Sequence, residues 1–340
     1  MSIFKKAVLR VMVGIPGSGK SYHCDYMKEK GYKVFSSDEY RIKVCGDVNC
    51  QTRNQEVFAS LYKDLLQALK NNENCTLDAT NISMKDRVRV FDQIKSIRDK
   101  IIVEAYVMNV PVSVCIERDS NRERCVGKDV LYKMISRFQC PQYFEGFDKI
   151  TFNHTIPAYG DTSSAVKIRL AMDVHNQNNP HHIYTLGKHC KKLAECYDEH
   201  SILYRAGLWH DVGKLVTQSF DEQKIAHYYS HDNFGAYYLC SFPEWNQDLA
   251  FDDFLLVVMI ANYHMNFHKD WRTEKYKKLF GEELYNTLVE FAENDKIASG
   301  TQCIHEDIMK MQKKEKLSLE EIINSSIWQD TYNRSSHENN

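Results

Sequence analysis

The segment Gly14-Ile15-Pro16-Gly17-Ser18-Gly19-Lys20-Ser21 constrains this chain more than any other. It follows the apolar run Val8 to Val13 and precedes a helix-like segment that ends near Lys30. In this strand–loop–helix context, glycines let backbone N–H groups turn inward around a phosphate, and the helix N-terminus adds positive charge. Lys20 would reach the β and γ oxygens, and the Ser21 hydroxyl would ligate Mg²⁺. A plain glycine-rich turn would not explain Lys20 and Ser21. The predicted nucleotide contacts are Gly17, Ser18, Gly19, Lys20 and Ser21.

Length and composition predict two domains in a reducing compartment. The chain has 340 residues, 43% of them hydrophobic, and a formal charge of −2, which excludes a broadly basic protein and predicts that any nucleic-acid contact is a local patch. Its 11 cysteines include no Cys-x-x-Cys pair, which argues against a zinc ribbon or a disulfide framework. The apolar stretch near the N-terminus is too short for a signal peptide or a membrane span. We therefore expect a cytoplasmic protein without membrane contact.

The distribution of histidine divides the chain. Thirteen of the 14 histidines lie after residue 150, and His23 is the exception. The turn-rich run from Pro157 to Ser164 is a plausible linker. We expect one domain over residues 1–156, a second over 165–332 and a disordered tail over 333–340. A last helix is expected around residues 317–323.

Strand-like and helix-like segments alternate after the glycine-rich loop, which predicts a parallel sheet covered by helices. Ligands of such sheets bind at the carboxyl ends of the strands. The expected strands are 33–36, 75–78 and 101–108, and the expected helices are 38–44, 55–69 and 84–97.

Polar residues follow two of these strands. Asp38 is suited to accept the proton of a substrate hydroxyl, and Arg41, one helical turn later, to hold an acceptor phosphate. A simple helix cap with a solvated arginine explains the same residues equally well. After the next strand, Asp78 could act on Mg²⁺ through water, and Thr80 and Asn81 could bind substrate or merely begin a turn.

Three arginines lie within the segment from Glu117 to Arg124. These arginines would neutralise charge on a transferred phosphoryl group. Alternatively, the segment is a solvated helix of mixed charge. The order of these motifs resembles that in the 5′-hydroxyl polynucleotide kinase domains of the phage type. The motifs are the glycine-rich loop, Ser37-Asp38-Glu39-Tyr40-Arg41, Asp78-Ala79-Thr80-Asn81 and the arginine segment. The resemblance covers roughly residues 7–150. It implies ATP or GTP as donor with Mg²⁺, Asp38 as general base, Arg41 as ligand of the acceptor 3′-phosphate and Arg122 as lid arginine on the donor phosphates.

The adjacent pair His210-Asp211 is the main feature of the second half. Neighbouring helical residues point about 100° apart, so both can bind one metal only near a helix end or with a partner from elsewhere. Gly213 suits a helix C-terminus. The donor types suit Mn²⁺, Fe²⁺, Mg²⁺, Ni²⁺ or Zn²⁺, with an open position to activate water.

Together with further His and Asp residues in apolar helical surroundings, this pair resembles the HD phosphohydrolase superfamily, an all-α fold, over about residues 168–300. Lys214 matches a residue of that family that contacts substrate phosphate. His182 is an alternative to His189 as the first ligand, and His231 and His264 match only two-metal members. The implied ligands are His189, His210, Asp211, His231, His264 and Asp295.

The two halves together resemble kinase–HD enzymes that heal nucleic-acid ends. The favoured hypothesis is a 5′-OH polynucleotide kinase joined to a 2′,3′-cyclic phosphodiesterase or 3′-phosphatase, acting on RNA in preference to DNA. Three alternatives stay open: a nucleoside or nucleotide kinase fused to a nucleotidase, an HD phosphodiesterase whose first domain only senses ATP, and a non-catalytic RNA-binding module.

Overall fold

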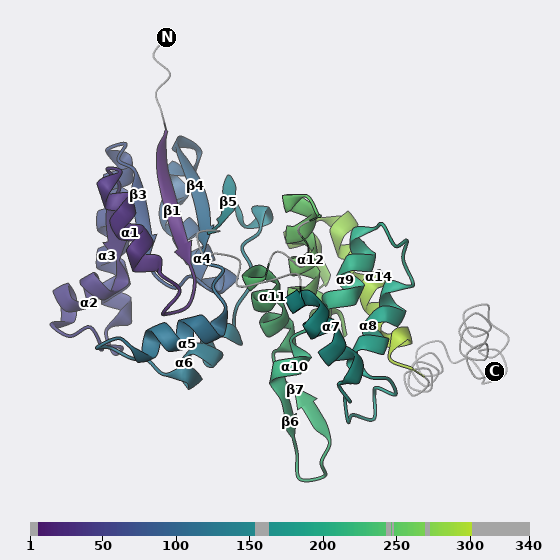
Figure 1. Ribbon diagram of the computed structural model, residues 1–340. Helices are drawn as coiled ribbons and strands as arrows, with labels where there is room; N and C mark the ends of the chain where they lie inside the picture. Colours follow the sequence, from purple (N-terminus) through teal and green to yellow (C-terminus); the bar gives the residue numbers. More distant parts are fainter. Residues whose placement is uncertain (1–5, 154–162, 243–245, 247, 269–272, 301–340) are drawn as a thin grey trace, which may run out of the picture. The chain divides into compact units, whose positions relative to one another are not determined.

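Strand β1, Ala7–Val13, is the central strand of a five-stranded parallel sheet in the computed structural model (Figure 1). It pairs with β3, Cys75–Asp78, on one side and with β4, Ile101–Val107, on the other. The outer strands are β2, Lys33–Ser36, and β5, Lys149–Phe152. All carboxyl ends therefore meet at one edge, where ligands of such sheets bind. The predicted parallel sheet is confirmed.

Contacts divide the chain into two compact units. The first comprises Met1–Asp161 and Ala236–Leu249, and the second comprises Thr162–Gly235 and Ala250–Asn340. The structure describes residues 6–153, 163–242, 246, 248–268 and 273–300. The expected helix at 317–323 and the expected tail at 333–340 lie outside the described residues, as does most of the expected linker at 157–164. The expected domain limits at 1–156 and 165–332 stay predictions.

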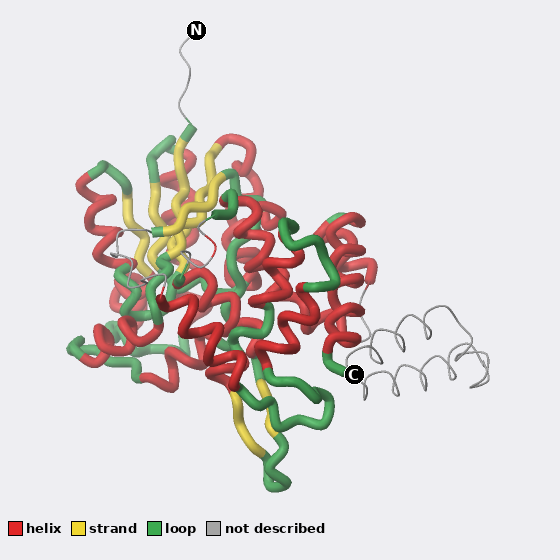
Figure 2. Tube along the Cα trace, turned by 45° about the vertical axis from the view of Figure 1, so that its right-hand side comes forward, coloured by secondary structure: helices red, strands yellow, loops and turns green. Residues whose placement is uncertain are grey.

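Helices accompany the strands of the first unit, and Figure 2 shows the strands running side by side with helices next to them. The expected helix 84–97 is too long by three residues, because the α-helix tightens into a 3₁₀ turn before β4 starts, as helix ends commonly do. The helices are α1 (Lys20–Glu29), α2 (Ser37–Cys45), α3 (Asn54–Lys70), α4 (Met84–Ile94), η1 (Lys95–Lys100), α5 (Val112–Ser120), α6 (Lys128–Ile135) and η2 (Tyr143–Glu145).

The second unit is helical. Helix α9 packs against α8 and α12, and α14 packs against α8 and η4. A two-stranded antiparallel hairpin, β6 (Gln218–Phe220) with β7 (Ala226–Tyr228), accompanies the helices. No helix in the described part of the chain is long and apolar enough to cross a membrane. The helices are α7 (Ser163–Val174), α8 (Leu186–Ala194), α9 (Ile202–Trp209), α10 (Lys214–Thr217), α12 (Phe251–Tyr263), η4 (His264–His268), α13 (Thr273–Phe280) and α14 (Glu282–Ala298). Helix α11 (His231–Ser241) belongs to this unit up to Gly235 and to the first unit from Ala236.

Candidate active sites

The glycine-rich loop links β1 to α1 and needs glycine for two reasons. Gly17 and Gly19 have φ angles of +79° and +90°, which side-chain-bearing residues rarely adopt. In addition, a Cβ atom on Gly17 would lie 2.3 Å from the carbonyl oxygen of Cys115. Helix α1 begins at Lys20, directly after this loop. The loop thus has the backbone conformation and the helix N-terminus that a phosphate site requires.

Ser21 and Asp78 place two oxygen ligands beside the loop. The Ser21 hydroxyl donates a hydrogen bond to Oδ2 of Asp78 over 3.3 Å, at the carboxyl end of β3. Burial raises the pKa of Asp78, whereas the Lys20 cation and the Ser21 hydrogen bond oppose that rise. Burial lowers the pKa of Lys20, and Asp78 opposes this effect. Hydroxyl and carboxylate oxygens are ligands that Mg²⁺ accepts, so the pair fits the metal that accompanies a nucleotide.

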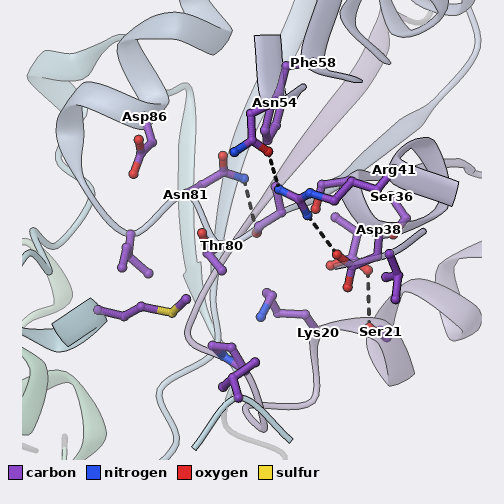
Figure 3. A pocket seen from close by; sticks show the side chains of 18 of the residues that line it. Lys20, Ser21, Ser36, Asp38, Arg41, Asn54, Phe58, Thr80, Asn81 and Asp86 are labelled. Atoms are coloured by element: carbon purple, nitrogen blue, oxygen red, sulfur yellow. Dashed lines mark hydrogen bonds and ion pairs between the residues drawn. The ribbon is translucent and has the colours of Figure 1, made fainter. Parts of the chain in front are cut away.

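Asp38 lies in the first turn of α2, and Figure 3 shows it beside Arg41. Its Oδ1 is 3.0 Å from Nη1 of Arg41, and its Oδ2 is 3.0 Å from Nη1 of Arg124. Arg41 also donates to Oδ1 of Asn54 over 2.9 Å, and its side chain is only 11% exposed, so it is not a solvated surface charge. Asp38, Arg41 and Arg124 line the same cavity as Lys20.

The arginine segment starts in α5 and continues beyond its end. Arg118 donates to the carbonyl oxygen of Gly17 over 3.4 Å, and Arg122 is exposed and lines the cavity. Buried Asp119 anchors the segment, because its Oδ2 accepts the backbone N–H groups of Val126 and Gly127. Arg122 was predicted from the sequence as the lid arginine, whereas Arg124 was missed, although the cluster of three arginines indicated both.

Thr80 and Asn81 line the cavity and also connect strands. The Asn81 side chain donates to the carbonyl oxygen of Met12 over 2.8 Å, and the Thr80 carbonyl accepts from the backbone N–H of Gly14 over 3.0 Å. Helix α4 is capped by Ser83, whose side chain accepts a hydrogen bond from the Asp86 backbone N–H. Asn81 therefore holds the β3 loop against β1.

In the second unit, the structure brings the expected His and Asp side chains together from separate elements. His189 lies in α8, Asp295 lies in α14, and His231 is the first residue of α11. His210 and His264 directly follow α9 and α12. All of them are buried, as is Asp211.

Asp211 lies between two groups of possible ligands. Its Oδ2 is 3.3 Å from Nε2 of both His189 and His210, and its Oδ1 is 3.0 Å from Nε2 of His231 and 3.4 Å from Nε2 of His264. Asp295 joins the first group, with its Oδ1 3.0 Å from Nε2 of His189. Among the described residues, the sets with metal-binding spacing are His189–His210–Asp295, Cys190–His210–Asp211 and Asp211–His231–His264.

Three of the imidazole rings are oriented by a backbone carbonyl three residues earlier. Nδ1 of His210, His231 and His264 lies 2.9, 2.7 and 2.9 Å from the carbonyl oxygens of Gly207, Tyr228 and Ala261. A carbonyl oxygen can only accept, so Nδ1 carries a proton and Nε2 is the ring atom that could bind a metal ion. Such hydrogen bonds are the usual outer support of metal-binding histidine.

Lys214 adds a buried positive charge. Its Nζ is 2.7 Å from Oδ2 of Asp211 and 3.3 Å from Nε2 of His182. Burial alone would raise the pKa of Asp211, but Lys214 and His210 hold that pKa well below its usual range. His182 faces Lys214 and belongs to none of the metal-spaced sets in the described chain, so the geometry favours His189 as the first ligand.

Gly213 does not end a helix in the way that its type predicts. Helix α9 already ends at Trp209, and Gly213 has a φ angle of −64° that any residue adopts. The reason for glycine is steric instead, because a Cβ atom there would lie 2.0 Å from the carbonyl oxygen of His231. The backbone turn after Asp211 thus approaches α11 closely enough for His231 to face Asp211.

The His and Asp cluster fits divalent metal ions. Within the described residues, Nε2 of His189, His210 and His231 and Oδ1 of Asp211 are buried without a hydrogen-bond partner. Buried polar atoms are rarely left in this state, and each costs about 1–3 kcal/mol. Imidazole nitrogen and carboxylate oxygen together suit ions such as Mn²⁺, Fe²⁺, Ni²⁺ and Zn²⁺.

Two known family models match parts of the chain. Residues 9–141 match the model of an AAA domain, and residues 181–323 match the model of an HD domain. The chain combines a P-loop kinase-like domain with an HD domain. These two domains imply the use of a nucleotide and of divalent metal.

Individual relatives are more distant. The chain is 27% identical over 154 residues to "Transcription factor bHLH140" of Arabidopsis thaliana, which covers 43% of the chain and about a sixth (16%) of that protein. Solved structures include the Pnkp1/Rnl/Hen1 complex, with 21% identity, a TM-score of 0.31 and coverage of 46% of this chain and 51% of that one. A fungal RNA kinase has 16% identity, a TM-score of 0.35 and coverage of 50% and 43%. TM-scores this low do not establish a shared fold.

Proposed function

We propose that this protein heals broken RNA ends. The first unit would act as an ATP-dependent 5′-OH polynucleotide kinase, and the HD unit as a metal-dependent 2′,3′-cyclic phosphodiesterase or 3′-phosphatase. The observation that carries the proposal is that one chain contains two separate groups of residues suited to reactions at phosphate. A phosphate loop shares its cavity with a carboxylate between two arginines, and a second unit buries a His and Asp cluster beside a lysine.

In the kinase step, the 5′-oxygen of the acceptor attacks the γ-phosphorus of ATP as the bond to the β-γ bridging oxygen breaks. Asp38 orients the 5′-hydroxyl and takes its proton. Arg41 binds the phosphate on the 3′ side of the acceptor nucleotide. Lys20, Arg122 and Arg124 offset the negative charge of the transferred group, which is the main contribution that proteins make to phosphoryl transfer.

In the hydrolytic step, water adds to phosphorus and a phosphorus–oxygen bond to the ribose breaks. His189, His210, Asp211, His231, His264 and Asp295 would hold divalent metal, which when bound acts as a Lewis acid and makes water a stronger nucleophile. Lys214, 4% exposed and 2.7 Å from Asp211, places a cation next to this cluster where it would bind a phosphate oxygen.

Two assays test the proposal. The first follows transfer of ³²P from labelled ATP to an RNA oligonucleotide with a 5′-OH end, and the second follows hydrolysis of a 2′,3′-cyclic phosphate end with added Mn²⁺ or Ni²⁺. We expect both activities in the wild type and loss of the second in a protein that carries both His210→Ala and Asp211→Ala. Absence of ³²P transfer by the wild type would refute the kinase half. Hydrolysis that survives the double substitution would refute the HD half.

A further inference from the structure

The kinase cavity extends well beyond the phosphate loop. Its volume is about 1350 Å³, larger than the roughly 300–1,000 Å³ that holds a typical small molecule. Its lining includes Lys20, Asp38 and Arg41 and also Arg89, from α4, and Arg137, from the segment after α6. Arg41 lies beside Asp38, whereas Arg89 and Arg137 lie near Asp86, so we distinguish a first end of the cavity at Asp38 from a second end at Asp86. Figure 3 shows Asp86, which lies at this second end, separated from Asp38 by Asn81. The chemistry proposed above occupies only the first end.

The second end contains two arginines with free hydrogen-bonding capacity. Asp86 lies 3.7 Å from Nη1 of Arg89 and 3.9 Å from Nη2 of Arg137. Both distances are too long for hydrogen bonds, and both arginine side chains are 60% exposed. Asp86 already accepts a 2.6 Å hydrogen bond from the Ser83 hydroxyl. Two guanidinium groups and one carboxylate leave a net charge of +1, which a phosphodiester would neutralise.

Aromatic side chains lie along the wall between the two ends. Phe58 and Tyr62 project from α3 into the cavity lining, with ring centroids 5.9 Å apart, and both are partly buried. Tyr62 is close enough to Arg89 for that cation to act on the pKa of its hydroxyl, which burial raises to about 12. Flat apolar walls between cationic sites are what a single strand requires, since bases stack on aromatic rings and phosphates bind arginine.

We propose that Arg89 and Arg137 form a second phosphate subsite, which binds the phosphodiester one or more nucleotides beyond the phosphate at Arg41. This inference rests on the proposed kinase function and names its substrate class. The preferred acceptor is an oligonucleotide of at least two nucleotides, whereas a mononucleotide is a poorer acceptor because it fills only the first end of the cavity. The kinase therefore selects its acceptor by length.

The test compares kcat/KM for three acceptors: a nucleoside 3′-monophosphate, a dinucleotide with a 3′-phosphate and a pentanucleotide. For wild type we expect kcat/KM to rise about tenfold or more once the second phosphate is present, the value of one charged hydrogen-bonded contact. The double variant Arg89→Gln/Arg137→Gln should lose this rise and keep the mononucleotide rate within about twofold. Its salt dependence on the pentanucleotide should weaken by about 0.7 in log–log slope, as expected for one lost phosphate contact.

Lys133→Gln is the matched control. Lys133 lies on α6, shortly before Arg137, and is exposed but does not line the cavity. Its substitution therefore removes one positive charge close to Arg137 without changing the proposed subsite, whereas the double variant removes two charges. Lys133→Gln should leave the length preference intact. Equal kcat/KM for all three acceptors in wild type, or equal losses on short and long acceptors in the double variant, would overturn the subsite and leave the kinase proposal standing. Absence of transfer to every acceptor would overturn the kinase proposal itself.

Discussion

Replacing Asp38 by asparagine separates chemistry from binding in the proposed kinase site. Asparagine has nearly the same size and keeps one oxygen that can accept the hydrogen bond from Arg41, which lies 3.0 Å away. It cannot take the proton of the acceptor hydroxyl. General-base catalysis contributes about 100- to 10,000-fold, so we expect kcat to fall by that factor, which corresponds to about 3–5 kcal/mol in the activation barrier.

The assay measures kcat with saturating ATP and a 5′-OH RNA oligonucleotide, and the dissociation constant for ATP by titration. The affinity for ATP should stay within about threefold, because the phosphate loop around Lys20 is separate from α2. Glu39→Gln is the matched control. Glu39 is the next residue, carries the same charge, is 61% exposed, lies 3.7 Å from Lys28 and does not line the cavity.

Three results would refute this reasoning about Asp38. An Asp38→Asn protein with kcat within about threefold of wild type would exclude a general base at this position. An equal loss in Glu39→Gln would show that the effect comes from the charge of α2. A loss of ATP affinity that accounts for the whole effect would place Asp38 in donor binding.

Further predictions concern stability and metal binding. Arg87→Met should lower the free energy of unfolding by about 3–5 kcal/mol in urea titrations, because it leaves the buried Glu145 carboxylate without its guanidinium partner; an unchanged midpoint would contradict this. Chelation should lower the thermal unfolding midpoint of wild type and leave a protein that carries both His210→Ala and Asp211→Ala unaffected, because these two residues contribute to every candidate ligand set and metal at about 100 times its dissociation constant stabilises by about 2.7 kcal/mol. Burial, and to a lesser extent Arg10, lower the pKa of His23 to about 4. Between pH 6.5 and 4 the unfolded chain therefore binds this proton and the folded chain does not, so the free energy of unfolding decreases as the pH is lowered. Between pH 7 and 5 the decrease is about 1 kcal/mol after halving for solvent exposure. His23→Phe should remove this part of the pH dependence of thermal unfolding, and an unchanged dependence would count against it.

Four of the five strands of the kinase-like unit could be predicted from sequence, whereas β5, Lys149–Phe152, was missed. Strands β2, Lys33–Ser36, and β3, Cys75–Asp78, begin and end where the sequence indicated. Strands of a parallel sheet alternate with helices along the chain, and ligand-binding residues follow at the carboxyl ends of the strands. Asp38 and Asp78 were therefore recognisable as candidates from their positions alone.

Other features depend on contacts that sequence patterns do not contain. The strands of the β6–β7 hairpin have three residues each, too few for an alternating pattern to stand out. Arg122 and Arg124 are both arginines just after α5, and only the path of the backbone decides which of them contacts Asp38. The contact between Arg124 and Asp38 joins residues 86 positions apart, so it is not visible in a local sequence pattern. Gly213 was expected at a helix end because of the backbone freedom of glycine. Its actual role is steric, because the close approach of the His231 backbone leaves no room for a side chain.

The HD cluster combines both situations. The orientation of His210, His231 and His264 is a local property, because each ring is held by the carbonyl three residues before it, where a helix ends or begins. The distances between the rings are not local, since they depend on how α8, α9, α11, α12 and α14 are placed around Asp211. Asp211 presents one oxygen to His189 and His210 and the other to His231 and His264. Because Asp211 would contribute one oxygen to each histidine pair, we predict that the purified protein would hold two divalent ions per chain, and metal analysis that finds only one would contradict this.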